Sequence, residues 1–233
     1  MRTPKRLPVG LNIEEFKRLI KATKKEHHKL AFLLGFGAGL RVSEIVGSKK
    51  RISRCCEADI LKEKTYQQFK TPHGKIEDVD RKRKTILTCT KCNKELELKD
   101  TKEHETEWAT PPLHPRHIQT DRILIELGKG AKDRVVPIPK GFKQKHLKML
   151  PIGITPRALQ KAFKVSCEKA GLLKEKPTLH FHSLRHGFAT RMVEAGVPIN
   201  QVKIALGHSS IATTGVYLRA NPKDMLKSYE DLF

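Results

Sequence analysis

Apolar residues recur at helical spacing over most of the chain. Asn12, with Glu15 three positions later, has the pattern of a capping box and predicts a helix that begins after it. Residues 27–35 are apolar on most sides, which predicts a buried helix. Further helices are expected over residues 182–195, 198–206 and 212–219, followed by an amphipathic tail over residues 222–233.

A helix over residues 155–171 has one apolar stripe. It starts at a Thr-Pro pair and ends at a glycine, and Leu159, Phe163 and Cys167 follow one another at intervals of four along it. Because the thiol lies on that stripe, Cys167 is expected to be a core residue and not a ligand.

Two short β-branched runs, residues 121–127 and 134–139, flank the turn sequence GKGAKD. Glycines between such runs predict a β-hairpin. Since helices are expected over most of the remaining length, the pattern indicates a mainly α fold, of the α+β class, with a small antiparallel sheet.

Composition sets residues 48–112 apart from the rest. This segment has 16 Lys and Arg against 12 Asp and Glu, a net charge of +4, so the other 168 residues carry +18 of the total of +22. It also contains four of the five cysteines and the single tryptophan. We therefore expect an inserted, cysteine-containing module over residues 48–112, in a host formed by residues 8–47 and 113–233.

The overall charge narrows the class of partner. Lys and Arg total 47 against 25 Asp and Glu, and the pI is about 9.9. Self-repulsion of this size destabilises a compact chain unless it binds a polyanion, which favours nucleic acid. No apolar run is long enough to span a membrane, and no apolar segment of a secretory signal follows the basic start. An odd number of cysteines without a signal disfavours disulfides, so an intracellular protein is expected.

Four short motifs follow one another along the chain: GAGLRVSEI, LGKGAKDRVVPIP, HSLRHGFAT and LGHSSIATTGVYLR. Together they resemble the signature boxes of the tyrosine recombinase (phage integrase) family. Within the boxes, His182 and Arg185 have the spacing H-x-x-R, and His208 stands nine residues before Tyr217. The resemblance covers roughly residues 8–47 and 113–220. It implies the catalytic domain of that family, of archaeal or mobile-element type.

The resemblance implies site-specific recombination or integration, in which DNA is cleaved and rejoined without hydrolysis. Tyr217 is the expected nucleophile, because a 3′-phosphotyrosyl intermediate conserves the energy of the broken bond. Arg41 and Arg185 are expected to hold the non-bridging phosphate oxygens through forked hydrogen bonds, with no cofactor for catalysis. His182 and His208 are expected to donate or relay protons.

A lysine is expected to protonate the departing 5′-oxygen. The resemblance gives this role to Lys129, in the hairpin turn, with Lys132 in the same turn as the alternative. Glu44, three residues after Arg41, is expected to orient that arginine or a neighbouring helix. His186 is expected to support or pack and not to react.

Partners and alternatives follow from the same resemblance. The expected partner is double-stranded DNA, on which the chain forms a homo-oligomer, a tetramer, in the cytoplasm at the nucleoid. The N-terminal core-binding domain typical of the family is expected to be absent or to belong to a longer parent chain. A type IB topoisomerase is the alternative within the same chemistry. A non-catalytic DNA-binding recombination factor is the alternative from another class.

The cysteines of the expected insertion indicate a structural metal. Cys89-x-x-Cys92 lies between two β-type runs, the pattern of a zinc knuckle, and Cys55 and Cys56 lie upstream. These four are the candidate ligands of a structural zinc ion. Few large apolar residues are available to fold the segment unaided, which favours the metal.

Three other possibilities remain open for this segment. The side chains of adjacent cysteines diverge, so one of the upstream pair could ligate with His104 or His73 as the fourth ligand. The segment could instead be a loosely packed basic insertion with incidental thiols. A redox role is disfavoured, because no thioredoxin-like βαβ pattern surrounds the Cys-x-x-Cys pair.

Overall fold

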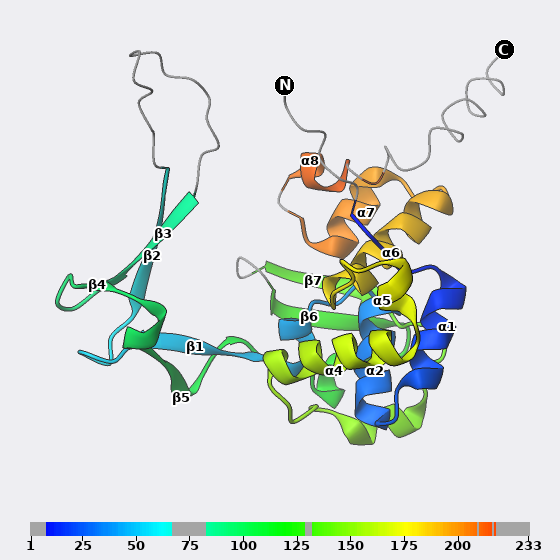
Figure 1. Ribbon diagram of the computed structural model, residues 1–233, viewed down its shortest axis with the longest axis horizontal. Helices are drawn as coiled ribbons and strands as arrows, with labels where there is room; N and C mark the ends of the chain where they lie inside the picture. Colours follow the sequence, from blue (N-terminus) through cyan, green and yellow to red (C-terminus); the bar gives the residue numbers. More distant parts are fainter. Residues whose placement is uncertain (1–7, 67–82, 129–131, 209, 216, 218–233) are drawn as a thin grey trace, which may run out of the picture. The chain divides into compact units, whose positions relative to one another are not determined.

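Two compact units make up the protein in this computed structural model, which describes residues 8–66, 83–128, 132–208, 210–215 and 217. The helical unit consists of residues 1–48 and 110–233, and the small unit consists of residues 49–109. Figure 1 labels the helices and strands of both.

Helices dominate the described part of the helical unit. Their bounds are α1 Ile13–Ala22, α2 Glu26–Gly37, α3 Val42–Val46, α4 Pro156–Lys169, α5 Leu172–Glu175, α6 His182–Glu194, α7 Ile199–Leu206 and α8 Ile211–Thr214, with 3-10 turns at Pro115–His117 and Gln144–Met149. The helices predicted at residues 27–35, 155–171, 182–195 and 198–206 are confirmed with small shifts of their ends. The predicted tail over residues 222–233 lies outside the described residues.

Local capping explains where α1 begins. The backbone N–H of Glu15 donates to Oδ1 of Asn12, and the N–H of Asn12 donates to Oε2 of Glu15, each at 2.8 Å. This reciprocal pair satisfies two N–H groups that the helix itself cannot, and it confirms the capping box.

An aromatic cluster forms the centre of the helical core. The ring of Phe32 on α2 lies 5.4 Å from that of Phe163 on α4 and 6.1 Å from that of Phe181, measured between centroids. Cys167 lies in the same core with 0% exposure, which confirms its role as a core thiol. Burial raises the pKa of this thiol to about 12, so it stays protonated and chemically quiet.

The predicted hairpin is the antiparallel pair β6 (Arg122–Gly128) and β7 (Lys132–Pro137), with Ile123 opposite Val136 and Ile125 opposite Arg134. Alternation places Ile123, Ile125 and Val136 in the core. The ribbon shows the hairpin beside the helices of the unit (Figure 1). The predicted mainly α fold with a small antiparallel sheet is thus confirmed.

A hydrogen bond joins the two segments of the helical unit, near the points where the chain leaves this unit and returns to it. The backbone N–H of Leu113 donates to the carbonyl of Ile45 at 3.2 Å, and both residues are buried in the same core. The chain between these two positions includes all of the small unit.

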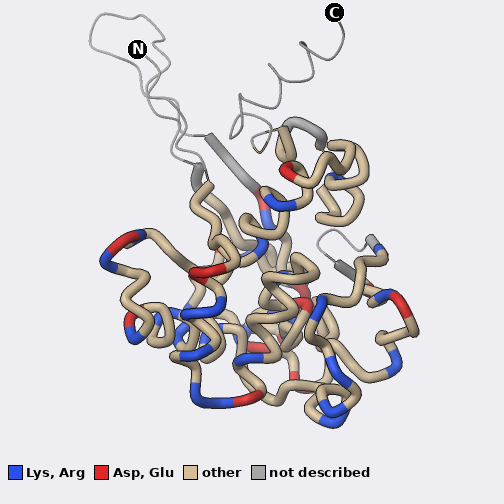
Figure 2. Tube along the Cα trace, turned by 90° about the vertical axis from the view of Figure 1, so that its right-hand side faces the viewer, with Lys and Arg blue, Asp and Glu red and all other residues tan. Residues whose placement is uncertain are grey.

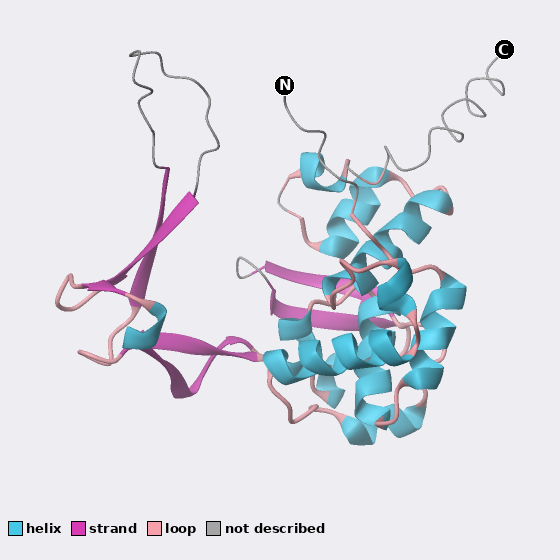
Figure 3. Cartoon of the chain, in the orientation of Figure 1, coloured by secondary structure: helices cyan, strands magenta, loops and turns pink. Residues whose placement is uncertain are grey.

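The small unit is built of strands, shown in magenta in Figure 3. They are β1 Ser48–Ser53 paired with β5 Thr101–Thr110, and a second sheet in the order β2 Ile60–Tyr66, β3 Arg83–Cys89 and β4 Glu95–Leu96, with a 3-10 turn at Leu98–Asp100. The two β-type runs predicted around the Cys-x-x-Cys pair are confirmed as β3 and β4. Ile52, Leu96 and Cys89 are the buried apolar residues of its described part.

Basic residues occur along the whole described trace, as the blue segments of Figure 2 show. None of the helices in the described part of the chain is long and apolar enough to cross a membrane.

Candidate active site and a cysteine cluster

Arg41 is held by the helix that it begins. It precedes α3, its backbone N–H donates to Oε2 of Glu44 at 2.7 Å, and its Nη1 donates to Oε1 at 2.8 Å. Its side chain keeps 15% exposure while that of Glu44 keeps 1%. The guanidinium is therefore fixed at one edge and open to solvent at another, as a group that binds an anion requires.

The carboxylate of Glu44 has a second arginine partner. Arg134 on β7 donates from Nη1 and Nη2 to its two oxygens, both at 2.8 Å, and from Nε to the carbonyl of Ala205 at 3.0 Å. Burial alone would raise the pKa of Glu44, but the hydrogen bonds and charge of Arg134, together with Arg41, lower it to about 2. Glu44 is therefore ionised and aligns Arg41 from its buried side.

Arg134 was not among the residues predicted from sequence. A signal was present, because Arg134 and Val136 are two apart on one strand and share its buried face. An arginine on a buried face requires a buried acceptor, and Glu44 supplies it.

Arg185 on α6 is the largest of the fully buried side chains, with 1% exposure. Its Nη1 donates to the carbonyl of Gly39 at 2.7 Å and its Nη2 to the carbonyl of Leu206. Among the described residues its Nε has no partner. Burial, with the nearby charge of Arg41, lowers its pKa to about 9, so it remains a cation at neutral pH.

Both arginines meet at the end of α7. The carbonyl of Leu206 accepts from Nη2 of Arg185 and, at 3.3 Å, from Nη2 of Arg41. The last carbonyls of a helix have no partner within it, so the arginines satisfy one of them. Gly207 follows with φ +59°, a left-handed conformation that ends the helix and leads the chain to His208.

The two histidines predicted to act as proton donors or relays are uncharged at neutral pH. Burial lowers the pKa of His182 to about 3 and that of His208 to about 4, and the positive charge of Arg185 acts in the same direction on both. Nδ1 of His208 shares a hydrogen bond of 3.0 Å with Oγ1 of Thr214. A neutral imidazole has one donor and one acceptor nitrogen, which suits a proton relay.

Tyr217 is buried, with 4% exposure, and its hydroxyl shares a hydrogen bond of 2.7 Å with Nδ1 of His186. Burial raises the pKa of Tyr217, against the opposing charge of Arg185. Burial, with His180 and Arg185, lowers the pKa of His186 to about 4. The ring of His186 lies 4.8 Å from that of His182, edge to face. His186 thus contacts the predicted nucleophile, which its expected supporting or packing role did not include.

The predicted general acid cannot be placed. Lys129 lies outside the described residues, and Lys132 begins β7 with nothing described of its side chain. The described ends of the hairpin on either side, Gly128 and Lys132, pair with each other.

A basic groove opens beside the arginines. It has a volume of about 760 Å3, is lined by Arg41 and His182 and extends along α4 past Arg157, Lys161 and Lys164. No carboxylate is among the lining residues that the structure describes. Its chemistry suits a phosphate backbone.

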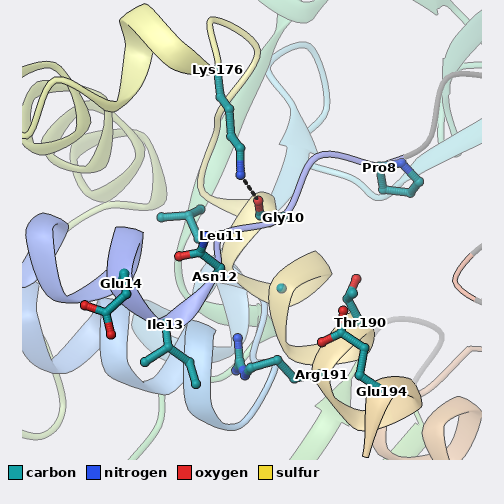
Figure 4. Close-up of a pocket in the computed structure, with 11 residues that line it drawn as sticks. Pro8, Gly10, Leu11, Asn12, Ile13, Glu14, Lys176, Thr190, Arg191 and Glu194 are labelled. Atoms are coloured by element: carbon teal, nitrogen blue, oxygen red, sulfur yellow. Dashed lines mark hydrogen bonds between the residues drawn. The ribbon is translucent and has the colours of Figure 1, made fainter. Parts of the chain in front are cut away.

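A separate pocket of about 510 Å3 lies between the start of α1 and α6. Figure 4 shows Lys176 over it, where its Nζ donates to the carbonyl of Gly10 at 3.1 Å. Arg191 lies on the α6 side and stacks on the ring of Phe36, 3.6 Å from its centroid. None of the predicted catalytic residues that the structure describes lines this pocket.

In the small unit the four candidate metal ligands lie together. The sulfur atoms of Cys55, Cys56, Cys89 and Cys92 are all within 4.8 Å of one another, and that of Cys55 is 3.6 Å from that of Cys92. The neighbouring Ser53 hydroxyl, with backbone N–H groups of the Cys-x-x-Cys turn, lowers the pKa of Cys89 to about 6. The cluster could hold a metal ion.

Neither histidine considered as a fourth ligand belongs to this cluster as described. Nδ1 of His104 accepts from the backbone N–H of Glu107 at 3.0 Å, and His73 lies outside the described residues. Adjacent side chains diverge along a strand, but Cys55 and Cys56 lie in a turn after β1, and both thiols reach the cluster.

Solved structures with a similar fold include a XerA recombinase, with a TM-score of 0.52 and 20% identity over 98% of this chain and 66% of the other. The catalytic domain of bacteriophage HP1 integrase matches with a TM-score of 0.53 and 17% identity, over 95% of this chain and 94% of the other. XerH recombinase was solved with its palindromic difH substrate in a post-cleavage complex. It matches with a TM-score of 0.53 and 19% identity, over 96% of this chain and 53% of the other. The fold is that of a tyrosine recombinase catalytic domain.

Sequence comparison finds similarity to the same class of proteins. The phage integrase family matches residues 153–224. Tyrosine recombinase XerA of Thermococcus onnurineus is 27% identical over 98% of this chain and 64% of its own length. A XerC-like tyrosine recombinase of Caldanaerobacter subterraneus is 29% identical over 94% of this chain and 52% of its own length. The chain is similar to the phage integrase family and to tyrosine recombinases, and it spans between half and two thirds of the length of these relatives.

Proposed function

We propose that this chain is a site-specific DNA recombinase or integrase that cleaves and rejoins duplex DNA through a 3′-phosphotyrosyl intermediate. The observation that supports it most is the convergence of Arg41 and Arg185 on the Leu206 carbonyl, with His208 two residues further along. Two fixed guanidinium groups beside a buried tyrosine provide a binding site for a phosphodiester and a nucleophile to attack it.

The proposed steps conserve bonds and protons. The oxygen of Tyr217 attacks phosphorus, the bond from phosphorus to the 5′-oxygen breaks, and Lys129 protonates that leaving oxygen. The phenol proton passes to Nδ1 of His186, which lies 2.7 Å away and is uncharged at neutral pH. Rejoining is the reverse, with a 5′-hydroxyl as the attacking group.

Charge on the transition state is neutralised by the arginines. Arg41 turns its open edge to the phosphate while Glu44 holds its other edge. The Nε of Arg185, which has no partner among the described residues, is available for a phosphate oxygen. His182 and His208 donate to the same phosphate from their neutral rings. Donors fixed in advance stabilise developing charge without a cost of reorganisation.

Duplex DNA is the proposed partner, and the groove beside Arg41 the proposed path of its backbone. The palindromic difH substrate bound by XerH, a protein of similar fold, supports this choice. Assembly as a tetramer on DNA, and a cytoplasmic location at the nucleoid, belong to the same proposal. Residues 8–47 and 113–233 would form the catalytic domain, with residues 48–112 inserted.

A nicked trapping substrate tests the reaction. Duplexes with a randomised core, each with a nick that lets a short 5′-hydroxyl fragment diffuse away after cleavage, are incubated with the protein. Adducts stable in detergent are then isolated and their DNA sequenced. We expect adducts enriched in one core sequence with the wild type and none with Tyr217→Phe. Unselective adducts, together with relaxation of supercoiled plasmid and no strand exchange between selected sites, would instead identify a type IB topoisomerase.

For the small unit we propose structural zinc bound by Cys55, Cys56, Cys89 and Cys92. Four thiolates suit a closed tetrahedral zinc site, and the described part of the unit has few buried apolar residues to stabilise it otherwise. The ion would stabilise the fold of the unit, and catalysis would proceed without it.

Metal analysis tests this proposal. Protein purified without added zinc should contain close to one equivalent, Cys89→Ser should lose it, and Cys167→Ala, in the helical core, should keep it. Chelation should leave cleavage of the trapping substrate intact. Metal absent from reduced wild-type protein would overturn the zinc proposal, and loss of cleavage on chelation would overturn the claim that the ion is only structural.

A further inference from the structure

Two turns of the small unit share one backbone pattern. The N–H of Ser53 donates to the carbonyl of Ala58 at 2.9 Å, and the N–H of Cys89 donates to the carbonyl of Lys94 at 3.0 Å, so each bond joins a residue to the fifth one after it. In each turn the residue four positions on is left-handed: Glu57 has φ +52° and Asn93 has φ +55°. These are the only non-glycine residues with positive φ among those described.

The shared pattern equates positions in the two turns. Ser53 corresponds to Cys89, and Cys56 corresponds to Cys92. Ser53 and Cys89 each end a strand, β1 and β3, and each has 0% exposure. The first turn therefore has a serine where the second has its first thiol, and it has an extra thiol, Cys55, two positions later.

Side-chain contacts agree with this correspondence. Oγ of Ser53 lies 3.3 Å from Sγ of Cys89, so it reaches the cluster from the equivalent side. The same Oγ is fixed by Ala58, whose N–H donates to it at 3.1 Å and whose carbonyl is 3.1 Å away. Sγ of Cys55 is 3.6 Å from Sγ of Cys92, close to the edge of about 3.8 Å of a tetrahedron with metal–sulfur bonds of about 2.3 Å.

We infer that the small unit is a pseudo-symmetric pair of metal knuckles in which Cys55 provides the fourth thiolate, while Ser53 occupies the symmetric ligand position without binding the metal. This rests on the proposed zinc site and deepens it, because it assigns the ligands of each turn and a supporting role to Ser53. A thiol placed at position 53 would then be aimed at the metal from a backbone already shaped to hold it.

Transfer of the fourth ligand tests the inference. Cys55→Ala should weaken zinc binding by about 10² or more, since even outer contacts of a metal site are worth about 10 to 100-fold in affinity. Adding Ser53→Cys to Cys55→Ala should restore one tightly bound equivalent. Adding Arg54→Cys instead is the matched control, because it restores the number of thiols at a position with no counterpart ligand. Zinc affinity by chelator competition and the visible bands of Co2+-loaded protein, which report thiolate coordination, are the readouts.

The outcomes separate the two proposals. A wild type that binds no metal overturns the zinc proposal itself. A wild type with one equivalent, together with no rescue by Ser53→Cys or equal rescue by Arg54→Cys, overturns this inference and leaves the zinc site standing. Unaltered affinity in Cys55→Ala also overturns it, because Cys55 would then not be the fourth ligand. Thermal unfolding of the helical unit, followed in parallel, shows that the variants remain folded.

Discussion

Arg134 binds Glu44 through both of its terminal nitrogens, each 2.8 Å from a different carboxylate oxygen, across 90 positions of sequence. Since Glu44 also holds Arg41, the hairpin and α3 together fix the orientation of this arginine, the first of the two in the proposed phosphate site. Arg134 is thus a positioning residue for the proposed phosphate site.

Arg134→Ala should leave the buried carboxylate of Glu44 with its bonds from Arg41 but without those from Arg134, and destabilise the protein by about 1 to 3 kcal/mol. Arg122→Ala, which breaks the exposed pair with Asp121, is the control and should cost about 0 to 1 kcal/mol. Urea unfolding gives both values. Equal free energies of unfolding for the two variants would contradict a stabilising role of the bonds between Arg134 and Glu44. Leucine at both 44 and 134 should cost less than the sum of the single substitutions, because neither charge then remains alone.

Tyr217→Phe should abolish the covalent protein–DNA adduct while DNA affinity stays nearly unchanged, since one hydroxyl is lost from a chain with a net charge of +22. Gel electrophoresis in detergent measures the adduct, and fluorescence anisotropy measures affinity. An adduct that persists at the wild-type level in the Phe variant would exclude Tyr217 as the nucleophile.

Arg41→Lys and Arg185→Lys keep the positive charge but lose the paired hydrogen bonds that a planar guanidinium can make. We expect cleavage to fall by about 10² to 10³ in each, the range typical of a lost transition-state donor. Single-turnover cleavage of the trapping substrate is the measurement, with Arg157→Lys at the edge of the groove as the control. Near-normal rates in both arginine variants would show that the phosphate is held elsewhere.

His186→Ala should slow cleavage by about 10² or more, because the acceptor for the proton of Tyr217 is lost. The rate should then rise with pH, as hydroxide or phenolate replaces the missing base, whereas a packing role would lower the rate equally at every pH. A flat ratio of mutant to wild-type rate between pH 6 and 9 would argue against proton transfer to His186.

Stability should fall as the pH drops below about 6.5. The folded-state pKa values of His182, His186 and His208 are lowered to about 3, 4 and 4, so the unfolded chain binds protons first and unfolding is favoured between pH 6.5 and about 4. Each ring contributes at most about 1.4 kcal/mol per pH unit, and less because solvent reaches it in part. His182→Gln should flatten the curve of unfolding free energy against pH. An unchanged slope in His182→Gln, measured by urea unfolding across this range, would contradict a neutral buried ring.

Local features were predictable from sequence because they depend on neighbours. The capping box at Asn12, the hairpin around GKGAKD and the strands around Cys89 and Cys92 each depend on a few adjacent residues. The motif boxes likewise gave the resemblance to the tyrosine recombinase family, since their spacing is fixed along the chain.

Contacts between distant elements could not be read in the same way. The bond between His186 and Tyr217 requires α6 and the segment after α8 to meet, and the bond between Arg134 and Glu44 requires the hairpin to pack against α3. Tertiary packing determines both of these contacts, and the local sequence pattern does not encode it. The turn that contains Cys55 also contains Glu57 in a left-handed conformation. Because residues other than glycine rarely adopt this conformation, the sequence did not indicate the turn.

The hydrogen bond between Leu113 and Ile45 has an evolutionary consequence. Because the returning backbone at Leu113 is hydrogen-bonded to Ile45, near the point where the chain leaves the helical core, a connection of a few residues could replace the segment between α3 and Leu113 without moving α3 or the hairpin. Loop closure over such a gap becomes only slowly more costly as the loop lengthens. Sequences of very different length and origin can therefore be gained, lost or exchanged at this junction, while selection on the proposed recombination chemistry continues undisturbed.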